Sequence, residues 1–362
     1  MVNSTNTSPI DKIEAKFNKN FNYSFADYKK KSKIKRSMPQ LKHLFWMPSL
    51  FYKRIYWILP RILKDIFFFL SILHKSPNTK IFARTKYEEL RILLDVKVSA
   101  LVLKIVPKDL KSDVSKSFKS GYCSFNLPNI NKLNPLIDEV ITYSNPSHAG
   151  AQPYFKDGKE ETIKNSFSAY YSFTKEDNKK INSFLNNNVS NDFKYHLSAL
   201  AGYKCEIKDI TYSLSIVQGE NSNSEMHQDT YGSVAKGFMY LQNIDKGNSP
   251  FEYLKGSYID ASYRSHQTNK AVLNNDLFSA GSTRLRNEDL DDAINKFGIE
   301  TFTGSKGLFV LANTSGYHRK GAHNSDKPRI ILACGVERKG VLSKLVHNLY
   351  SILKLKAIKI SK

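Results

Sequence analysis

The feature that most constrains the fold is a change of hydrophobic period at about residue 205. Before it, apolar residues recur at helical spacing, as in 83–118 and 132–143. Pro107 should interrupt the first of these helices. After residue 205, stretches such as 210–217 (ITYSLSIV) alternate apolar and polar residues, as strands do. Many short strands in the second half predict a mainly β fold with flanking helices, arranged as a sandwich or barrel.

Composition divides the 362 residues into four segments. The first is polar and lysine-rich, and we expect it to be mobile. The second is a helical extension rich in aromatic and basic residues, the third is the β domain, and the last is a basic amphipathic helix. In chain order, these segments are residues 1–40, 41–112, 113–340 and 341–362. The polar residues at 1–20 do not form a signal peptide, so none is expected.

Residues 41–75 are dominated by apolar and aromatic side chains, but charges and prolines interrupt them. The longest uncharged apolar run, 66–73, is far shorter than the roughly 20 residues that a membrane-spanning helix needs. Two alternatives remain: peripheral contact with a membrane surface, or a helical pair packed on the core. Residues 341–362 have similar composition, so the two ends either dock together or face one membrane.

The net charge of +22 arises from 55 Lys and Arg against 33 acidic residues. Such a charge attracts nucleic acid, acidic lipid headgroups or anionic small substrates, although a biased base composition of the gene explains it equally well. The chain has no recognisable nucleic-acid module, so no nucleic-acid partner is expected. Cys123, Cys205 and Cys334 lie far apart and form no disulfide framework, which favours a reduced, cytoplasmic location.

The segment Glu225-Met-His-Gln-Asp-Thr-Tyr carries the first candidate for chemistry. Residues two apart in a strand point to the same side, so His227 and Asp229 are able to converge on one point. An imidazole and a carboxylate form two thirds of the two-His, one-carboxylate triad that suits Fe(II). The pattern alone is weak, because a histidine hydrogen-bonded to a nearby aspartate at the surface has the same spacing.

A later segment supplies the remaining candidates. His318 precedes Arg329 by 11 residues, and Arg329 opens an apolar strand. A hairpin of this length places the imidazole at a metal and the guanidinium deeper in the same cavity, where its planar fork suits a dicarboxylate. His323 is an alternative third ligand, but it leaves a shorter hairpin. Lys327 is a weaker candidate for the carboxylate, because it lies outside the strand pattern.

Together these motifs resemble the phytanoyl-CoA dioxygenase family of iron and 2-oxoglutarate oxygenases. The resemblance rests on the HQD triplet, on the stretch 248–258 (NSPFEYLKGSY) and on the spacing of His318 and Arg329, and it covers about 115–340. It implies a double-stranded β-helix, a jelly-roll barrel. It also implies that His227, Asp229 and His318 bind Fe(II), and that Arg329 binds the distal carboxylate of 2-oxoglutarate. Tyr258 stands where the family often has a histidine that is not a ligand.

The resemblance further implies an oxygenase that consumes O2 and releases succinate and CO2 while hydroxylating an unactivated carbon. The expected substrate is a small molecule, anionic or lipid-like in character. Tyr212, Ser325 and Phe238 are additional candidates for contacts with the co-substrate or the metal pocket, although ordinary core or loop packing explains each of them as well. The alternative function is a non-catalytic metal-binding jelly roll, with membrane association as one form of it.

Overall fold

The computed structural model describes residues 77–360 except for 147, 151–153, 157–158, 162–166, 220–221, 231, 274–282 and 326. The segments predicted at 1–40 and 41–75 therefore lie outside the described residues.

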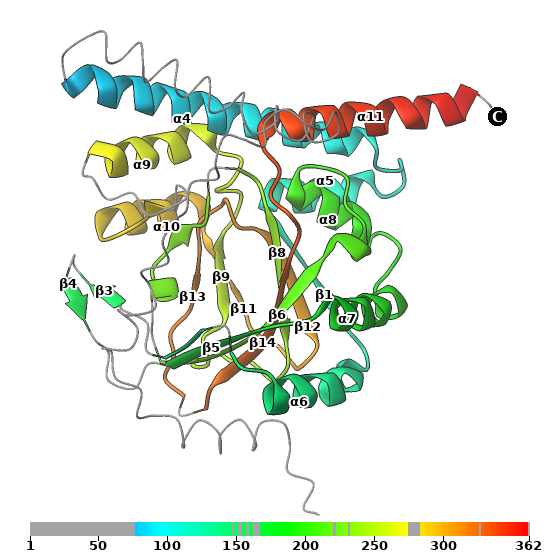
Figure 1. The fold of residues 1–362 in the computed structure, drawn as a ribbon. Helices are drawn as coiled ribbons and strands as arrows, with labels where there is room; N and C mark the ends of the chain where they lie inside the picture. The colour runs from blue at the N-terminus through cyan, green and yellow to red at the C-terminus, as the bar shows by residue number, and fades with distance from the viewer. Residues whose placement is uncertain are drawn as a thin grey trace, which may run out of the picture.

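Two antiparallel sheets form the centre of the described fold (Figure 1). The larger sheet has the strand order β1 (Tyr122–Asn126), β12 (Leu308–Asn313), β8 (Ala235–Tyr240), β14 (Arg329–Gly335), β6 (Thr211–Gln218), β5 (Phe167–Ser172) and β2 (His148–Gly150). The smaller sheet has the order β10 (Thr283–Arg284), β7 (His227–Gln228), β13 (His318–Lys320), β9 (Phe251–Leu254) and β11 (Ile299–Phe302). A separate hairpin pairs β3 (Tyr154–Lys156) with β4 (Lys159–Glu161).

The path of the chain through the two sheets identifies the fold. From β6 to β9 and again from β11 to β14, successive strands alternate between the larger and the smaller sheet. The change of direction occurs at β9 and β11, which are neighbours in the smaller sheet. This is the winding of a double-stranded β-helix, so the predicted jelly roll with flanking helices is confirmed.

Both faces of the larger sheet are covered, and the alternation of side chains along each strand separates them. On β14, Ile330, Leu332 and Cys334 belong to the main apolar core together with residues of the helices. Ile331, between them, packs with Tyr240 on the other face, which looks into the barrel. The barrel interior therefore lies between the two sheets, and the largest core lies outside it.

Helices surround the barrel on several sides (Figure 1). Leu185 of α7 and Leu197 and Leu200 of α8 pack into the main core. The helices along the chain are α4 (Pro77–Ala100), α5 (Lys111–Ser120), α6 (Asn134–Tyr143), α7 (Lys175–Asn188), α8 (Phe193–Ala201), α9 (Ala261–Leu273), α10 (Glu288–Phe297) and α11 (Val341–Ile360).

Local sequence signals explain several helix ends. The helical stretch predicted at 83–118 is divided into α4 and α5 around Pro107, as expected from a residue that lacks an amide hydrogen. α5 ends at Gly121, whose φ of 87° is a conformation that favours glycine. α7 begins with a capping box, because Thr174 and Asp177 each accept a hydrogen bond from the other's backbone amide.

α4 and α11 lie together along one side of the barrel (Figure 1). The amide of Asn348 on α11 donates to the carbonyl oxygen of Val98 on α4, at 3.1 Å, and to that of Gly202, at 3.0 Å. Among the described helices, none combines the length and apolar character required to cross a membrane. The predicted C-terminal amphipathic helix thus packs on the domain through part of its surface.

Candidate metal centre

The two histidines of the candidate site lie opposite each other in the smaller sheet. His227 opens β7 and His318 opens β13, and the two are direct cross-strand partners. Asp229 follows β7 immediately, and its backbone amide donates to the carbonyl oxygen of Thr314 at 2.9 Å. Gly316 completes the turn before His318, and a Cβ there would collide with the hydroxyl of Tyr253. Strand pairing therefore brings together residues that are 91 positions apart.

The side chains of His227, Asp229 and His318 converge on one point. Each of the three residues offers one possible ligand atom, and these three atoms lie within 4.8 Å of one another. Nε2 of His227 is 3.6 Å from Oδ1 of Asp229, and Nε2 of His318 is 3.7 Å from Oδ2. Both histidines are buried, while the aspartate side chain is 21% exposed. This is a donor set that one divalent metal ion can share from one side.

Backbone contacts fix the orientation of both rings. Nδ1 of His227 lies 2.7 Å from the carbonyl oxygen of Glu225, and Nδ1 of His318 lies 3.0 Å from that of Gly316. A carbonyl oxygen only accepts, so the hydrogen of each neutral ring is on Nδ1. Nε2 then presents its lone pair toward the carboxylate of Asp229. Metal-binding histidines are commonly held by such a second contact.

The electrostatics of the three residues favour the charge states that bind a metal. Burial lowers the pKa of His227 to about 3, and the nearby His318 adds to the effect. Burial also lowers the pKa of His318. Burial alone would raise the pKa of Asp229, but His318 and Lys236 outweigh it, so the pKa lies below its ordinary value. At neutral pH the site holds two neutral imidazoles and one carboxylate, and such a set fits Fe(II).

Arg329 is the first residue of β14. Its neighbour Ile330 faces the helix-covered core, so Arg329 is on the opposite face of the strand, which looks into the barrel. Its Nη1 donates to the carbonyl oxygen of Ser249 at 2.6 Å. Within the described part of the chain, its buried Nε has no hydrogen-bond partner and the residue forms no ion pair with an acidic side chain. A buried guanidinium with a free donor fits a carboxylate ligand, because such a ligand supplies both the charge and the acceptor.

The other candidates from the sequence divide into two groups. Phe238 stacks on Phe251 with ring centroids 4.4 Å apart, and Phe251 lies 5.7 Å from the ring of His318. Phe238 is therefore separated from His318 by one aromatic ring. The structure does not bring Tyr212 to the pocket, because it lies on the helix-covered face of β6 and its hydroxyl donates to Asn182 at 2.7 Å.

Ser325 and His323 lie in the segment between His318 and Arg329, and each makes a contact of its own there. The hydroxyl of Ser325 accepts from the backbone amide of Lys327 at 3.1 Å, which is a local turn contact. Lys327 is exposed and does not share the burial of Arg329. His323 is not one of the three residues whose ligand atoms converge, and its Nδ1 lies 2.8 Å from the hydroxyl of Ser249. The structure therefore favours His318 over His323 as the third ligand.

Arg264 of α9 is a buried residue that the sequence did not single out. Its Nε donates to the side chain of Gln228 at 3.2 Å, and its Nη2 donates to the carbonyl oxygen of Thr230 at 3.4 Å. These two partners flank Asp229 in the chain. A third bond runs from Nη1 to the carbonyl oxygen of Tyr258 at 2.9 Å. Arg264 thus contacts the residues on both sides of the candidate ligand, through the side chain of Gln228 and the backbone of Thr230.

A second buried group adjoins the same loop. Oδ2 of Asp95 accepts from both the amide and the hydroxyl of Ser233, each at 2.7 Å. Nζ of Lys344 donates to Oδ1 of Asp95 at 2.9 Å and to the carbonyl oxygen of Ser233 at 2.8 Å. We call these three residues the Asp95 cluster. It connects α4 and α11 to the loop that follows Asp229, and no sequence signal pointed to it.

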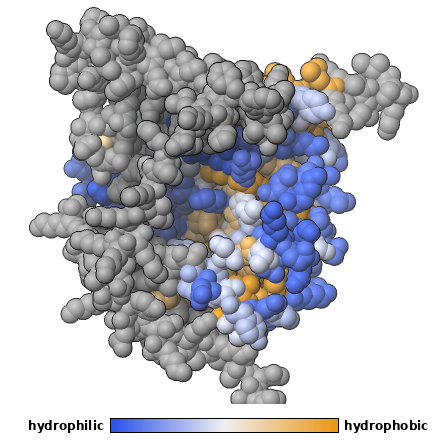
Figure 2. Space-filling model, viewed as in Figure 1, coloured by the Kyte–Doolittle hydropathy of each residue, from blue (hydrophilic) through white to orange (hydrophobic). Residues whose placement is uncertain are grey.

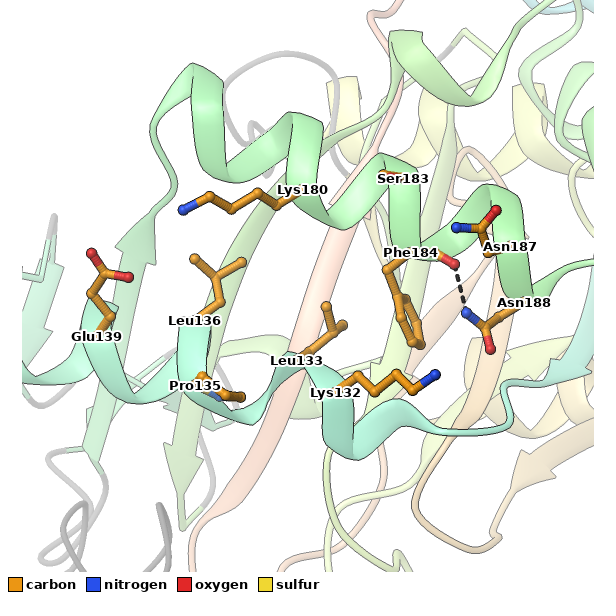
Figure 3. Close-up of a pocket in the computed structure, with 10 residues that line it drawn as sticks. All are labelled: Lys132, Leu133, Pro135, Leu136, Glu139, Lys180, Ser183, Phe184, Asn187 and Asn188. Atoms are coloured by element: carbon orange, nitrogen blue, oxygen red, sulfur yellow. Dashed lines mark hydrogen bonds between the residues drawn. The ribbon is translucent and has the colours of Figure 1, made fainter.

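A pocket of about 440 Å³ opens elsewhere, between α6 and α7 (Figure 3). Leu133, Leu136 and Phe184 line it, with Lys132 and Lys180 at its sides. None of the residues lining it belongs to the converging triad, and α6 and α7 lie on the helix-covered side of the larger sheet. It is therefore a surface feature separate from the candidate metal centre.

Comparisons with known proteins give weak similarities. A scan against protein-family models found no match, and neither did a search of the curated proteins. Among solved structures, the chain is similar to the epimerase SnoN in complex with Fe3+, alpha ketoglutarate and nogalamycin RO, at 10% identity and a TM-score of 0.39, covering 64% of this chain and 84% of that one. It is also similar to the non-heme alpha ketoglutarate dependent carbocyclase SnoK, at 13% identity and a TM-score of 0.39, covering 64% and 83%.

A third similar structure is EctD from S. alaskensis with bound Fe, at 12% identity and a TM-score of 0.38, covering 64% of this chain and 77% of that one. Similarities at this level carry no argument about what the chain does. The functional assignment therefore rests on the geometry of His227, Asp229, His318 and Arg329.

Proposed function

We propose that this protein is an iron(II)- and 2-oxoglutarate-dependent oxygenase. The observation that supports it best is the convergence of His227, Asp229 and His318 within one jelly-roll barrel, with their ligand atoms within 4.8 Å of one another. The buried and incompletely bonded guanidinium of Arg329 supports the choice of co-substrate. Three ligands on one side of Fe(II) leave positions for the 2-oxo acid and for O2.

The residues of the chain would bind and orient the reactants. Nε2 of His227, Nε2 of His318 and a carboxylate oxygen of Asp229 would hold the metal, and Arg329 would fix the far carboxylate of 2-oxoglutarate. The aromatic wall of Phe238 and Phe251 would keep water from the pocket. When bound, Fe(II) with 2-oxoglutarate supplies the means of activating O2 for oxidation of a carbon centre.

The test is metal- and 2-oxoglutarate-dependent turnover by the full chain. Purified protein supplied with Fe(II), 2-oxoglutarate and O2 should release succinate, at a slow rate even without the true substrate. His227→Ala should abolish this release, and His266→Ala, an exposed histidine of α9, should not. Zinc in a closed site with no binding of 2-oxoglutarate would overturn the proposal in favour of a non-catalytic metal-binding module.

We propose an anionic small molecule as the substrate, and hydroxylation as the reaction. Lys236 lies beside the metal site, with Nζ 2.7 Å from Oδ2 of Asp229, and its side chain is 44% exposed. An ammonium group that is partly open to solvent and next to the reacting centre is suited to a carboxylate or phosphate on the substrate. The chain's net charge of +22 would attract such a molecule. The resemblance to phytanoyl-CoA dioxygenases remains part of this proposal.

Peripheral contact with a membrane is a further part of the proposal. α4 and α11 carry most of the large exposed apolar side chains among the described residues, including Leu93, Leu349 and Leu353. Hydrophobic residues are visible over α11 at the upper edge of Figure 2. Apart from the buried Lys344, the α11 sequence contains three lysines and no acidic residue, which suits anionic headgroups. Sedimentation with anionic vesicles should be lost in the Leu349→Glu/Leu353→Glu variant, and unchanged binding would contradict the contact.

A further inference from the structure

Ser249 connects two basic side chains at one end of the barrel. It lies in the turn before β9, and its backbone amide donates to the carbonyl oxygen of Ala322 at 2.8 Å. Its own carbonyl oxygen accepts from Nη1 of Arg329, and its hydroxyl lies 2.8 Å from Nδ1 of His323. One residue therefore positions both side chains. We call Ser249, His323 and Arg329 the Ser249 cluster.

Two nitrogen atoms of this cluster are buried without a hydrogen-bond partner among the residues that the structure describes. They are Nε of Arg329 and Nε2 of His323. A buried polar atom that lacks a partner is destabilising, so native structures rarely keep two of them in one place without a ligand to satisfy them. Nε of Arg329 is always a donor. When the hydroxyl of Ser249 donates to Nδ1 of His323, the ring hydrogen of His323 is on Nε2, so Nε2 is a donor as well.

The charge around His323 is positive on more than one side. Burial is the largest influence on the pKa of His323, and the charges of Lys320 and Arg329 lower it further, to about 4. Lys320 lies two positions after His318 on β13 and is buried. Its Nζ donates to the carbonyl oxygen of Gly219, beyond the end of β6. An anion placed among these groups would reduce their mutual repulsion and supply the missing acceptors.

We propose that His323 is a second binding residue for the distal carboxylate of 2-oxoglutarate. Nε2 of His323 donates to one carboxylate oxygen, and Nε of Arg329 donates to the other, while Ser249 holds both side chains in place. This inference rests on the proposed function. It assigns His323 a role different from that of a metal ligand, and it makes the cluster selective for a dicarboxylate over a 2-oxo monocarboxylate.

The experiment measures binding rather than turnover. The full chain is loaded with Mn(II), which replaces Fe(II) and does not support oxidation, and is titrated calorimetrically with 2-oxoglutarate or with 2-oxobutyrate. The second compound has the same metal-binding end but no distal carboxylate. His323→Leu should weaken 2-oxoglutarate about 10–100-fold, as expected for a lost bond to a charged group, and leave 2-oxobutyrate unchanged. His323→Gln, which keeps a donor, should recover part of the loss.

The controls separate this inference from the proposed function. His266→Leu, at an exposed histidine of α9, should bind both compounds as the unchanged protein does. If His323→Leu does not fold, Ser249→Ala removes only the hydroxyl that orients the ring and should show the same selective loss. Equal weakening of both compounds, or no weakening, overturns the role of His323 alone. A metal-loaded natural chain that binds no 2-oxoglutarate overturns the proposed function and this inference together.

Discussion

Two groups of buried charge in this molecule differ in how completely they are paired. In the Asp95 cluster, an ammonium group, a carboxylate and a serine satisfy one another, with Asp95 and Lys344 at 1% and 0% exposure. In the Ser249 cluster, two buried nitrogen atoms have no hydrogen-bond partner in the described ranges of the chain. A charge group that is complete within the protein stabilises the fold, whereas an incomplete one is best explained by a ligand. The two clusters should therefore respond to mutation in opposite ways.

The largest effect is expected when the complete cluster is broken. Lys344→Met leaves the carboxylate of Asp95 buried without its counter-charge, and we expect the free energy of unfolding to fall by about 3–5 kcal/mol. Denaturation in urea measures it. Lys97→Met, at an exposed lysine of α4, is the control and should change stability by less than about 0.5 kcal/mol.

Replacing both charges tests whether the pairing itself is the cause. Asp95→Leu combined with Lys344→Met removes the ion pair without leaving an uncompensated charge, so it should recover a large part of the lost stability. A double variant as unstable as Lys344→Met would show that the contacts of α11, and not the charge, are what the single substitution disturbs.

Arg264 contacts both neighbours of Asp229 in the chain and should affect the metal site indirectly. Arg264→Met removes the donors to Gln228 and Thr230 on either side of Asp229, so the affinity for Mn(II) should fall about 10–100-fold, as for other residues that position metal ligands. Titration followed by electron paramagnetic resonance measures it. Lys270→Met, on the same helix and exposed, is the matched control. Unchanged affinity in a folded Arg264→Met protein would contradict the positioning role.

In the incomplete cluster, substitution should have little effect on stability. Arg329→Met removes a buried charge that has no acidic partner among the described residues, so without ligand the free energy of unfolding should stay the same or rise by up to about 2 kcal/mol. Binding of 2-oxoglutarate should be lost in the same variant. A fall in stability as large as that of Lys344→Met would mean that Arg329 serves the fold.

The smallest of the expected effects is that of pH on stability, which should be absent near neutral pH and appear only in acid. Burial alone would raise the pKa of Asp95, but the charge of Lys344 and the bonds from Ser233 outweigh it, so the folded pKa lies below the ordinary value of 3.8. The contribution is complete above pH 3.8 and is lost as the pH falls through the folded pKa. The stability difference between the natural chain and Asp95→Asn should therefore be constant from pH 7 to 5 and shrink in acid. A difference that grows in acid would contradict this sign.

Local spacing identified the candidate residues of the metal centre, and the family resemblance selected among them. His227 and Asp229 are two positions apart, and His318 and Arg329 are joined by one short hairpin, so each pair depends on geometry within a single stretch of chain. Period two also predicted the strands of the jelly roll. It did not predict which face of a strand looks into the barrel. Tyr212 was misplaced for that reason, because on β6 the apolar positions Tyr212, Leu214 and Ile216 face the helix-covered core and the barrel lies on the side of the serines.

The sequence by itself thus predicted a β-rich sandwich or barrel from its periodicity, and the resemblance to one family added the jelly roll and a candidate ligand set. Only the tertiary structure decided what supports that centre. Asp95 and Lys344 are 249 positions apart, and Ser249 is 80 positions from Arg329; Asp95, Lys344 and Ser249 give no local signal. Long-range strand pairing and helix packing bring these groups together. Whether a buried charge is satisfied depends on such distant partners, and it is this pairing that distinguishes the Asp95 cluster from the Ser249 cluster.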